Sequence, residues 1–547
     1  MRHFIQKSHI LDIRNNPGLS LQKVALGNCR NLSFSSPALL KEYHDALLFV
    51  RAYPKDEESV EMAGNELIRV AAFIRQAKGE RWRLSMTGSG LPGTQITCQY
   101  TRILLRWLLD SCPEAIQPAE TASGPAEVKA FFQSLLPGIE FNGSATGSLS
   151  LWKRIRVLSG HNFNREALEW LLQLTEQAPI PVLLKDQLFD GLKIFTGWTL
   201  TMDGLNRSFL EASGGKKVYY AAGKKFQFNA LIRKPLKNLF PDLEEKIRLI
   251  SIARASLAFY YRETDPFTYA SPSETSYFEL GDGFRIALYG MTQDRRFSLD
   301  SYIGFLAFKN GLPVAYGGGW IFGHRCKIGV NIYPPYRGAD SAFLFTQVLR
   351  VYYQQYRVHY FLVKPYQFGR GNPEGIRTGA FWFYYKLGFR SASPAIERLS
   401  GSEWEKIKSG KGYRSSPDIL KKMTEAPLVL VLKKEGLTDP RAAELSERIT
   451  CMIRDQYAGN RLLALESAKR RWRKMGGFPH STFKEVTSAA WQDWLLLFLF
   501  LGGTNPRKAV WAKLTRLRFK AAEAVFIRYW QENRQLWANS RPTADSR

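Results

Sequence analysis

A short turn that opens a predicted helix is the first place in this 547-residue chain where residue types and spacing indicate chemistry. The turn, Pro334–Gly338, follows a run typical of a strand, Arg325–Tyr333, and precedes a helical pattern, Ala339–Tyr356. The first N–H groups of a helix have no intrahelical partner and lie at the positive end of its dipole, so this position favours anions. Arg337 would add positive charge, and Gly338 permits a sharp bend.

A tyrosine on the next predicted helix supplies a second chemical group. Tyr384 lies in the aromatic run Phe381–Phe389, which overlaps the helix predicted for Gly375–Leu387. A phenol keeps its proton to about pH 10, so it can protonate a leaving group. An anion site and a proton donor on consecutive helices indicate group transfer from a phosphorylated carrier. Alternatively, Tyr384 is a core residue whose hydroxyl bonds a carbonyl.

These groups must be positioned by a sheet, and the residues from about 268 to 435 predict one. Strands are expected at Phe284–Tyr289, Tyr302–Phe308, Val314–Phe322, Arg325–Tyr333, Val358–Val363 and Leu428–Leu432. Asn310-Gly311 predicts a two-residue hairpin turn between the second and third strands, because both residues tolerate positive φ. Gly317–Gly319 in the third strand predicts a bulge or a close backbone approach.

The stretch from about 270 to 435 resembles the GNAT superfamily, whose members move acyl groups from acyl-CoA to an amine. The order of predicted elements is similar: hairpin strands, a strand ending in a turn, a helix, a strand and a second helix. The strings that carry the resemblance are YYKLGF at Tyr384–Phe389 and the turn Pro335–Gly338. The resemblance covers roughly a third of the chain and implies an acyltransferase domain over 268–435.

The resemblance also implies which residues hold the carrier. The family's phosphate loop, Arg/Gln-x-x-Gly-x-Gly/Ala, aligns with Arg337, Gly338, Ala339, Asp340, Ser341 and Ala342. The strand Cys326–Tyr333, including Ile332, would receive the pantetheine arm of acyl-CoA or acetyl-CoA, the expected co-substrate. Tyr384 would protonate the departing thiolate. No metal is implied.

Two positions depart from the family pattern. Asp340 stands where a glycine is expected, and its carboxylate adds negative charge beside the expected diphosphate or caps the helix itself. Relatives often carry an asparagine seven residues before the tyrosine, where this chain has Arg377. The nearest asparagine is Asn372, about one turn further upstream, and it is the candidate carrier contact.

Amine acylation needs a group that takes a proton from the acceptor. The strand Arg325–Tyr333 contains no acid. The candidate acids nearby in sequence are Glu279, Asp282 and Asp300. His324 and His359 lie beside predicted strands and are more typical of core residues than of bases.

The rest of the chain predicts a multidomain α+β or α/β protein in which mainly helical regions flank the GNAT-like mixed sheet. Residues 1–255 form the N-terminal region, with a helix at Thr94–Asp110, a linker at 113–125 and a mixed β segment at 190–230. Residues 438–540 form a basic helical C-terminal region. No chemical motif is visible in residues 1–250.

The amino-acid composition indicates the cellular compartment and the kind of partner to expect. The formal net charge of +28 favours anionic partners such as nucleic acid or an acidic acyl-carrier protein. Alternatively, the charge only prevents self-association of a soluble basic protein. Five scattered cysteines without a C-x-x-C pair indicate a reducing compartment and no zinc site. The longest apolar run, Trp494–Leu501, is too short to span a bilayer. A cytoplasmic protein without a membrane span or signal peptide is expected.

Three functions are therefore compatible with the sequence. The first is an acyltransferase that uses acyl-CoA or another thioester carrier and an unknown amine or hydroxyl acceptor. The second is a non-catalytic GNAT-like binding module that contacts nucleic acid or another anionic partner. The third is a tRNA-dependent aminoacyl transferase, in which tRNA replaces CoA and would account for the charge.

Overall fold

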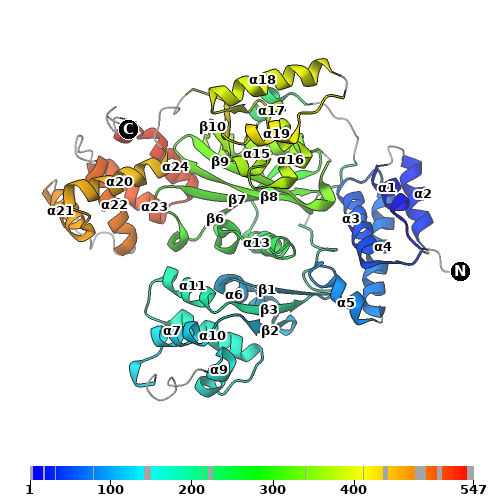
Figure 1. The fold of residues 1–547 in the computed structure, drawn as a ribbon, viewed down its shortest axis with the longest axis horizontal. Helices are drawn as coiled ribbons and strands as arrows, with labels where there is room; N and C mark the ends of the chain where they lie inside the picture. Colours follow the sequence, from blue (N-terminus) through cyan, green and yellow to red (C-terminus); the bar gives the residue numbers. More distant parts are fainter. Residues whose placement is uncertain are drawn as a thin grey trace. The chain divides into compact units, whose positions relative to one another are not determined.

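The computed structural model describes residues 4–15, 19–30, 32–77, 79–140, 149–212, 215–219, 226–338, 340–410, 412–434, 441–474, 488–501 and 508–538. Helices and two β-sheets make up these residues (Figure 1). The chain divides into two compact units. The first contains Met1–Ala222, Arg248–Thr268 and Lys309–Pro313, and the second contains Gly223–Ile247, Tyr269–Phe308 and Val314–Arg547. The predicted combination of helices and sheet in a multidomain chain is confirmed.

The first unit is mainly helical, with a small antiparallel sheet in the order β1-β3-β2. Its elements are α1 (Lys7–Asn15), α2 (Leu19–Cys29), α3 (Pro37–Ala52), α4 (Glu57–Gln76), α5 (Glu80–Met86), β1 (Gln95–Gln99), α6 (Arg102–Ser111), η1 (Pro113–Ala115), β2 (Ile116–Thr121), α7 (Pro125–Leu135), α9 (Leu151–Ser159), α10 (Arg165–Gln177), α11 (Val182–Gly191), β3 (Ile194–Thr199) and α14 (Asp265–Thr268). The helix α13 (Leu243–Ala258) contributes residues to both units.

Two expectations for this unit are wrong. Residues 113–125 were expected to be a linker, but they contain η1 and β2, and β2 pairs with β3. The helix expected from Thr94 begins only at Arg102, because Gln95–Gln99 forms β1 and pairs with β3. In both cases pairing with a strand about 80 residues or more away in sequence overrides the local pattern.

The second unit is built on a nine-stranded sheet in the order β11-β12-β10-β9-β8-β7-β6-β5-β4. Its elements are α12 (Phe228–Arg233), β4 (Lys237–Asn238), β5 (Ala270–Gly281), β6 (Phe284–Met291), η2 (Gln293–Arg295), β7 (Ser301–Lys309), β8 (Leu312–Phe322), β9 (Arg325–Ile332), η3 (Pro334–Tyr336), α15 (Ser341–Tyr356), β10 (Tyr360–Val363), η4 (Pro365–Phe368), α16 (Pro373–Thr378), α17 (Ala380–Lys386), β11 (Arg390–Ser391), α18 (Pro394–Ser409), α19 (Pro417–Met423), β12 (Leu428–Val431), α20 (Ala442–Tyr457), α21 (Arg461–Lys474), α22 (Ser488–Leu501), α23 (Lys508–Lys520), α24 (Glu523–Glu532) and α25 (Gln535–Ala538). The helices α15 to α19 lie on one side of this sheet in Figure 1.

The predicted strands and the predicted hairpin are present in this sheet. Asn310 and Gly311 both have positive φ, 48° and 87°, and connect β7 to β8. β10 runs parallel to β9, whereas β8 is antiparallel to β9 and β12 is antiparallel to β10. Because β9 and β10 are parallel, α15 is the crossover helix that connects them. The helices α16 and α17 lie in the following connection, from β10 to β11.

The three consecutive glycines of β8 are explained by close approach and not by a bulge, since β8 pairs with β9 without a register shift. A Cβ on Gly318 would lie 2.7 Å from the Tyr302 ring. A Cβ on Gly317 would collide with the carbonyl oxygen of Gly329 and with the Phe305 ring. The sheet therefore tolerates no side chain at these positions.

Gly317→Ala is expected to destabilise the second unit by about 1–3 kcal/mol, because the added methyl meets backbone that cannot move aside. The matched control is Gly401→Ala in α18, where no atom lies within 4 Å of the added methyl. That variant should gain about 0.5–1 kcal/mol from helix propensity. Denaturant titration measures both, and equal midpoints for Gly317→Ala and wild type would contradict the close-packing explanation.

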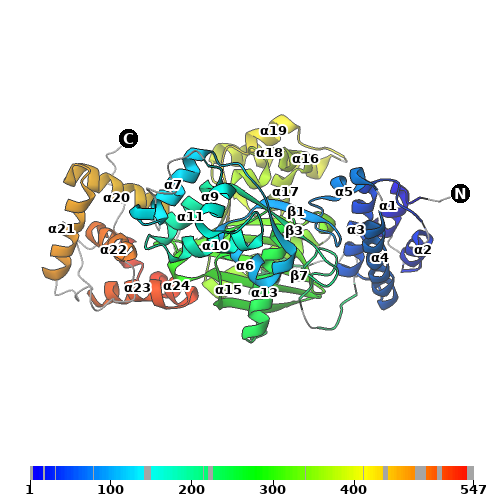
Figure 2. The same cartoon turned by 90° about the horizontal axis from the view of Figure 1, so that it is seen from below.

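The C-terminal helices belong to the second unit and are held by a buried ionic network. The grouping of α20 to α23 is visible in Figure 1 and again in Figure 2. Arg518 of α23 pairs with Glu523 of α24 at 2.7 Å, and both side chains are almost completely buried. Arg518 also donates to the carbonyl oxygens of Phe297 and Asp300, and Ser301 Oγ donates to Glu523 at 2.6 Å. This network fastens α23 and α24 to the segment before β7.

Candidate functional site

The place where two parallel strands stop pairing is the centre of the candidate site. β9 and β10 pair only at Arg325–Tyr360, Cys326–Phe361 and Lys327–Leu362. β9 continues to Ile332 and pairs with β8 along its whole length, while β10 ends at Val363. Within the described part of the chain, no strand pairs with the other edge of residues 328–332. Along that edge the backbone N–H and C=O groups have no partner strand among the described residues, and the carbonyl oxygen of Ile332 accepts from Arg337 Nε.

The turn that follows β9 has the geometry expected of a tight strand-to-helix connection. Gly338 has a φ of 90°, a conformation that favours glycine, and the space around its Cα is open. Ala339 lies outside the described residues. Asp340 has a φ of 33° and occupies the N-cap position of α15. The first intrahelical bond runs from the N–H of Leu344 to the carbonyl oxygen of Asp340 at 2.8 Å, so the amides of Ser341 and Ala342 belong to the first turn.

Asp340 does not cap the helix with its carboxylate, because its side chain accepts no capping hydrogen bond. Among the described residues, the expected alternative of a carboxylate that caps the helix is therefore not found. Its negative charge still lies at the helix N-terminus and opposes a diphosphate there.

Arg337 lies beside this turn with an exposed guanidinium. Its Nε donates to the carbonyl oxygen of Ile332 at 3.3 Å, and its Nη1 lies 3.9 Å from the Glu374 carboxylate. Glu374 is engaged more closely by Arg377, at 2.7 Å. These two contacts hold the Arg337 guanidinium near the end of β9 and beside the turn.

Tyr384 lies in α17 and is 3% exposed. Its ring packs against Phe345 of α15 at 5.5 Å and Phe368 of η4 at 6.3 Å between centroids. Burial raises the pKa of Tyr384 above its ordinary value. Among the described residues its hydroxyl has no hydrogen-bond partner, so the alternative of a core tyrosine that bonds a carbonyl is not found. A protonated phenol between α15 and the segment after β10 is available as an acid.

The helix expected for Gly375–Leu387 is broken. Gly379 adopts a φ of 64° and separates α16 from α17. Asn372 stands at the N-cap of α16, and its Nδ2 donates to the carbonyl oxygen of Tyr366 at 3.1 Å. Its amide therefore holds the turn after β10.

The structure separates the three candidate bases. Glu279 pairs with Arg285 at 2.8 Å on neighbouring strands, and Asp282 occupies a turn with a φ of 52°. Burial raises the pKa of Asp300, an effect that the nearby charges of Lys327 and Arg518 partly offset. Asp300 is thus the candidate base whose carboxylate interacts electrostatically with a residue of β9, Lys327.

Lys327 and two aromatic side chains form a cluster on β7, β8 and β9 that the sequence did not reveal. Trp320 lies across from Lys327 in the β8–β9 ladder, and the Lys327 ammonium is 4.2 Å from the Trp320 ring centroid. Trp320 stacks on Tyr302 at 3.7 Å. Burial lowers the pKa of Lys327, and the charge of Lys364 lowers it further. A perturbed lysine and a perturbed carboxyl near one strand are typical of a functional site.

The two histidines considered from sequence lie elsewhere in the sheet. His324 and His359 stack on each other at 4.7 Å between centroids and are 5% exposed. They lie where β9 and β10 begin, at the paired end of the strands. His324 Nδ1 lies 3.0 Å from the carbonyl oxygen of Arg357. This is a core arrangement, as expected.

A serine, a histidine and an aspartate also meet inside the first unit. His44 Nε2 lies 3.0 Å from Ser208 Oγ, and His44 Nδ1 lies 3.5 Å from Asp45 Oδ1. His44 is completely buried, Ser208 is 2% exposed, and burial lowers the pKa of His44 to about 4. A substrate cannot reach Ser208, so this arrangement stabilises the unit.

Comparisons with models of known protein families, with curated proteins and with solved structures give no match. Among the helices that the structure describes, none has the length and apolar character required to cross a membrane. Over the same residues, no group of three or more His, Cys, Asp or Glu side chains is arranged to hold a metal ion.

Proposed function

We propose that this protein is an acyltransferase of GNAT-like fold that uses acyl-CoA or another thioester carrier and an amine or hydroxyl acceptor. The observation that carries the proposal is that β9 runs beyond its last pair with β10 to the turn before α15, while the buried Tyr384 packs against Phe345 of α15. An extended thioester arm would bond to this unpaired edge in the way that an added strand does.

The donor would lie along the unpaired edge of β9. Its phosphate groups would meet Arg337 and the first-turn amides of α15, with Gly338 allowing close approach. Its pantetheine amides would bond to the backbone near Ile332 in the manner of an added strand. Ala339 and Ser341 would complete the phosphate loop.

The chemistry requires two proton transfers. The acceptor nitrogen or oxygen attacks the thioester carbonyl, the C–S bond breaks, and the departing sulfur takes the proton of the Tyr384 hydroxyl. Tyr384 then regains a proton from solvent. The proton of the acceptor passes to the Asp300 carboxylate, directly or through water, because the raised pKa of Asp300 makes it a stronger base than an ordinary aspartate. Asp300 then releases this proton to solvent, so that both groups return to their starting states.

The acceptor would lie over the cluster of Tyr302, Trp320 and Lys327. These side chains offer an aromatic surface and one cation, which suits an acceptor that carries an apolar part and a negative charge.

A second candidate, a non-catalytic anion-binding module, is favoured by one observation. Asp340 places a carboxylate at the helix N-terminus, where it weakens diphosphate binding. In that case the exposed cations of α21, among them Arg470, Arg473 and Lys474, would bind the partner.

The test is thermal unfolding with and without acetyl-CoA, longer acyl-CoAs and CoA. Binding raises the melting temperature by mass action on the folded state. Arg337→Ala should weaken the affinity about 10- to 100-fold by removing a charged hydrogen-bond donor. Asp340→Asn keeps a residue that tolerates positive φ but removes the charge, and it should tighten binding about two- to fivefold.

The matched control is Arg357→Ala, which removes an exposed arginine at the opposite end of α15. It should leave the response to each donor unchanged. If no donor moves the melting curve of the wild-type protein or of Asp340→Asn, the acyl-CoA proposal is rejected in favour of the binding module.

A further inference from the structure

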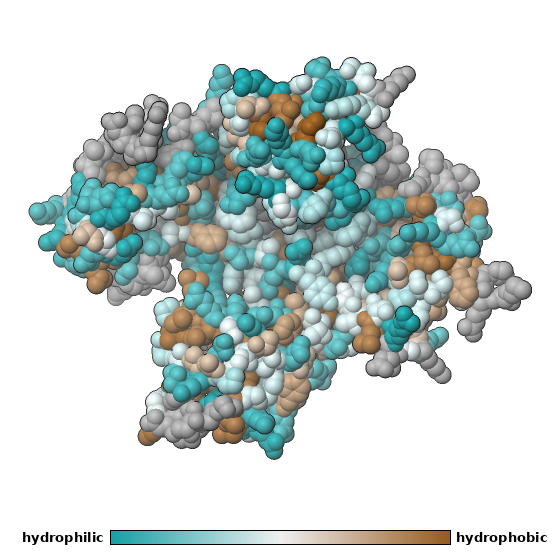
Figure 3. Space-filling model, in the orientation of Figure 1, coloured by the Kyte–Doolittle hydropathy of each residue, from teal (hydrophilic) through white to brown (hydrophobic). Residues whose placement is uncertain are grey.

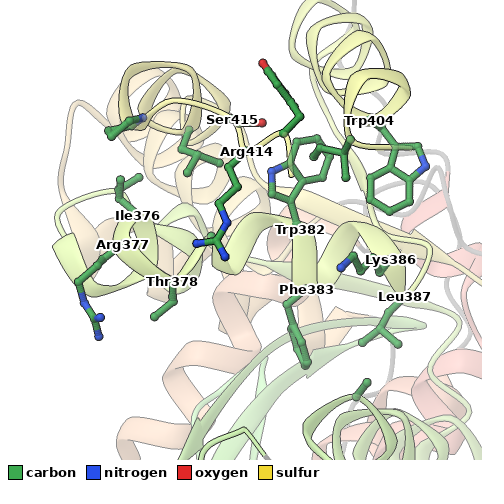
Figure 4. A pocket seen from close by; sticks show the side chains of 16 residues that line it. Ile376, Arg377, Thr378, Trp382, Phe383, Lys386, Leu387, Trp404, Arg414 and Ser415 are labelled. Carbon is green, nitrogen blue, oxygen red and sulfur yellow. The ribbon is translucent and has the colours of Figure 1, made fainter. Parts of the chain in front are cut away.

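A pocket of about 780 Å³ lies on the second unit between α16, α17, α18 and α19 (Figure 4). Its lining contains no described residue of β9 or β10, although Ala342 at the start of α15 forms part of its wall. Two of its walls, α18 and α19, come from the segment between β11 and β12, for which the sequence indicated no chemistry. A pocket of this size is typical of small-molecule sites.

The charges around the pocket are positive. Arg377, Lys386 and Arg414 line it, and no carboxylate does so among the described residues. Arg377 points away in Figure 4 and is held by Glu374. Arg414 and Lys386 form no ion pair within the described part of the chain, and Arg414 extends into the hollow beside Trp382 (Figure 4). Two cations without counter-charges favour an anionic ligand.

The loop that carries Arg414 is anchored on both sides of it. The Glu403 carboxylate of α18 accepts hydrogen bonds from Tyr413 Oη and Ser415 Oγ, each at 2.8 Å, and from Lys406 Nζ at 2.7 Å. Burial works to raise the pKa of Glu403, but these three hydrogen bonds outweigh it and hold the pKa below its usual value. The backbone of Arg414 is therefore positioned before a ligand arrives, which reduces the entropic cost of binding.

The rest of the pocket is aromatic and apolar. Trp382 and Trp404 stack at 5.6 Å and Phe383 lies on the same helix, α17. The Trp382 Nε1–H is buried and has no acceptor among the described residues. Figure 3 shows apolar surface surrounded by hydrophilic surface in the part of the molecule formed by α17, α18 and α19.

We propose that this pocket binds a small aromatic anion, that is, a ring system carrying a phosphate or a carboxylate. The ring lies against Trp382 and Trp404, and the anionic group meets Arg414 and Lys386. The site does not depend on acyl transfer, since neither Arg337 nor Tyr384 lines it.

Isothermal titration calorimetry on the full chain tests the proposal with AMP and indole-3-acetate as probes and adenosine as the uncharged control. At least one probe should bind, and adenosine should bind at least about tenfold more weakly than AMP if AMP is the ligand. Arg414→Ala and Lys386→Ala should each weaken binding about tenfold or more. Binding of AMP alone assigns a phosphate ligand, and binding of indole-3-acetate alone assigns a carboxylate.

Two controls locate the binding. Arg398→Ala removes an exposed cation of α18 that does not line the pocket, and it should have no effect. Arg337→Ala should also have no effect, which separates this pocket from the proposed donor site. The proposal is overturned if neither probe binds, if the double variant Arg414→Ala, Lys386→Ala binds as well as wild type, or if Arg337→Ala abolishes binding.

Discussion

Arg518→Ala is expected to lower the free energy of unfolding by about 3–5 kcal/mol. The Arg518 side chain has no exposed surface, and its partner Glu523 is 1% exposed. Without the guanidinium, the Glu523 carboxylate stays buried with Arg296 at 3.5 Å as its nearest cation, and the carbonyl oxygens of Phe297 and Asp300 lose a donor. A buried charge without its partner costs far more than the intact pair contributes.

Denaturant titration followed by circular dichroism measures this loss. Arg516→Ala is the matched control, because Arg516 is an exposed arginine on the same helix, α23. The double variant Arg518→Met, Glu523→Leu removes both charges and should recover much of the stability. If Arg518→Ala unfolds at the same denaturant concentration as Arg516→Ala, the network contributes little and the attachment of α23 and α24 has another origin.

Tyr384→Phe should lower the turnover number for acyl transfer about 100-fold or more while donor affinity stays unchanged. The hydroxyl is the only group lost, and the ring contacts with Phe345 and Phe368 remain. Burial keeps the phenol protonated above the ordinary pKa of tyrosine, so the wild-type rate should not fall from loss of this proton until the pH exceeds about 10.

The turnover number is measured as the rate at which free CoA thiol is released from acyl-CoA, with an acceptor that the wild-type protein acylates. Tyr385→Phe is the control on the neighbouring residue, whose hydroxyl lies 3.4 Å from Glu397. It should retain wild-type turnover. A Tyr384→Phe protein with an unchanged turnover number would remove Tyr384 from the proposed mechanism and leave water as the acid.

The strands around the site could be predicted because their signals are local. The turn residues Asn310 and Gly311 and the apolar runs on either side of them define β7 and β8 without further information. Gly317–Gly319 likewise indicated a crowded sheet, although the crowding atoms of Tyr302, Phe305 and Gly329 are visible only in three dimensions. Strand position follows from residue types, whereas the contacts across the sheet do not.

Other parts of the fold depend on distant pairing. β5 was missed, since Ser271, Ser273, Glu274 and Ser276 give it a polar sequence and its pairing with β6 contains register shifts. The break at Gly379 was missed because a positive φ leaves no trace in the aromatic periodicity around it.

The candidate site was predicted in part. The turn Pro334–Gly338 and Tyr384 are where the sequence indicated, at the end of β9 and on the helix after β10. Lys327 looked like one charge within a strand, and its position across from Trp320 became apparent only with the register. The pocket could not be predicted, because Lys386, Trp404 and Arg414 come from three different segments.

The segment between β11 and β12 begins and ends at the same place on the sheet. Arg390 pairs with Val429, Ser391 pairs with Leu428, and the N–H of Ala392 bonds to the carbonyl oxygen of Pro427 at 2.9 Å. These pairs hold the two ends of the segment together as the strands of a hairpin would, whatever the length of chain between them. The entropic cost of closing a longer connection grows only slowly with its length. Evolution can lengthen, shorten or exchange α18 and α19 as a module, and so alter ligand preference, without disturbing the strands that carry the proposed chemistry.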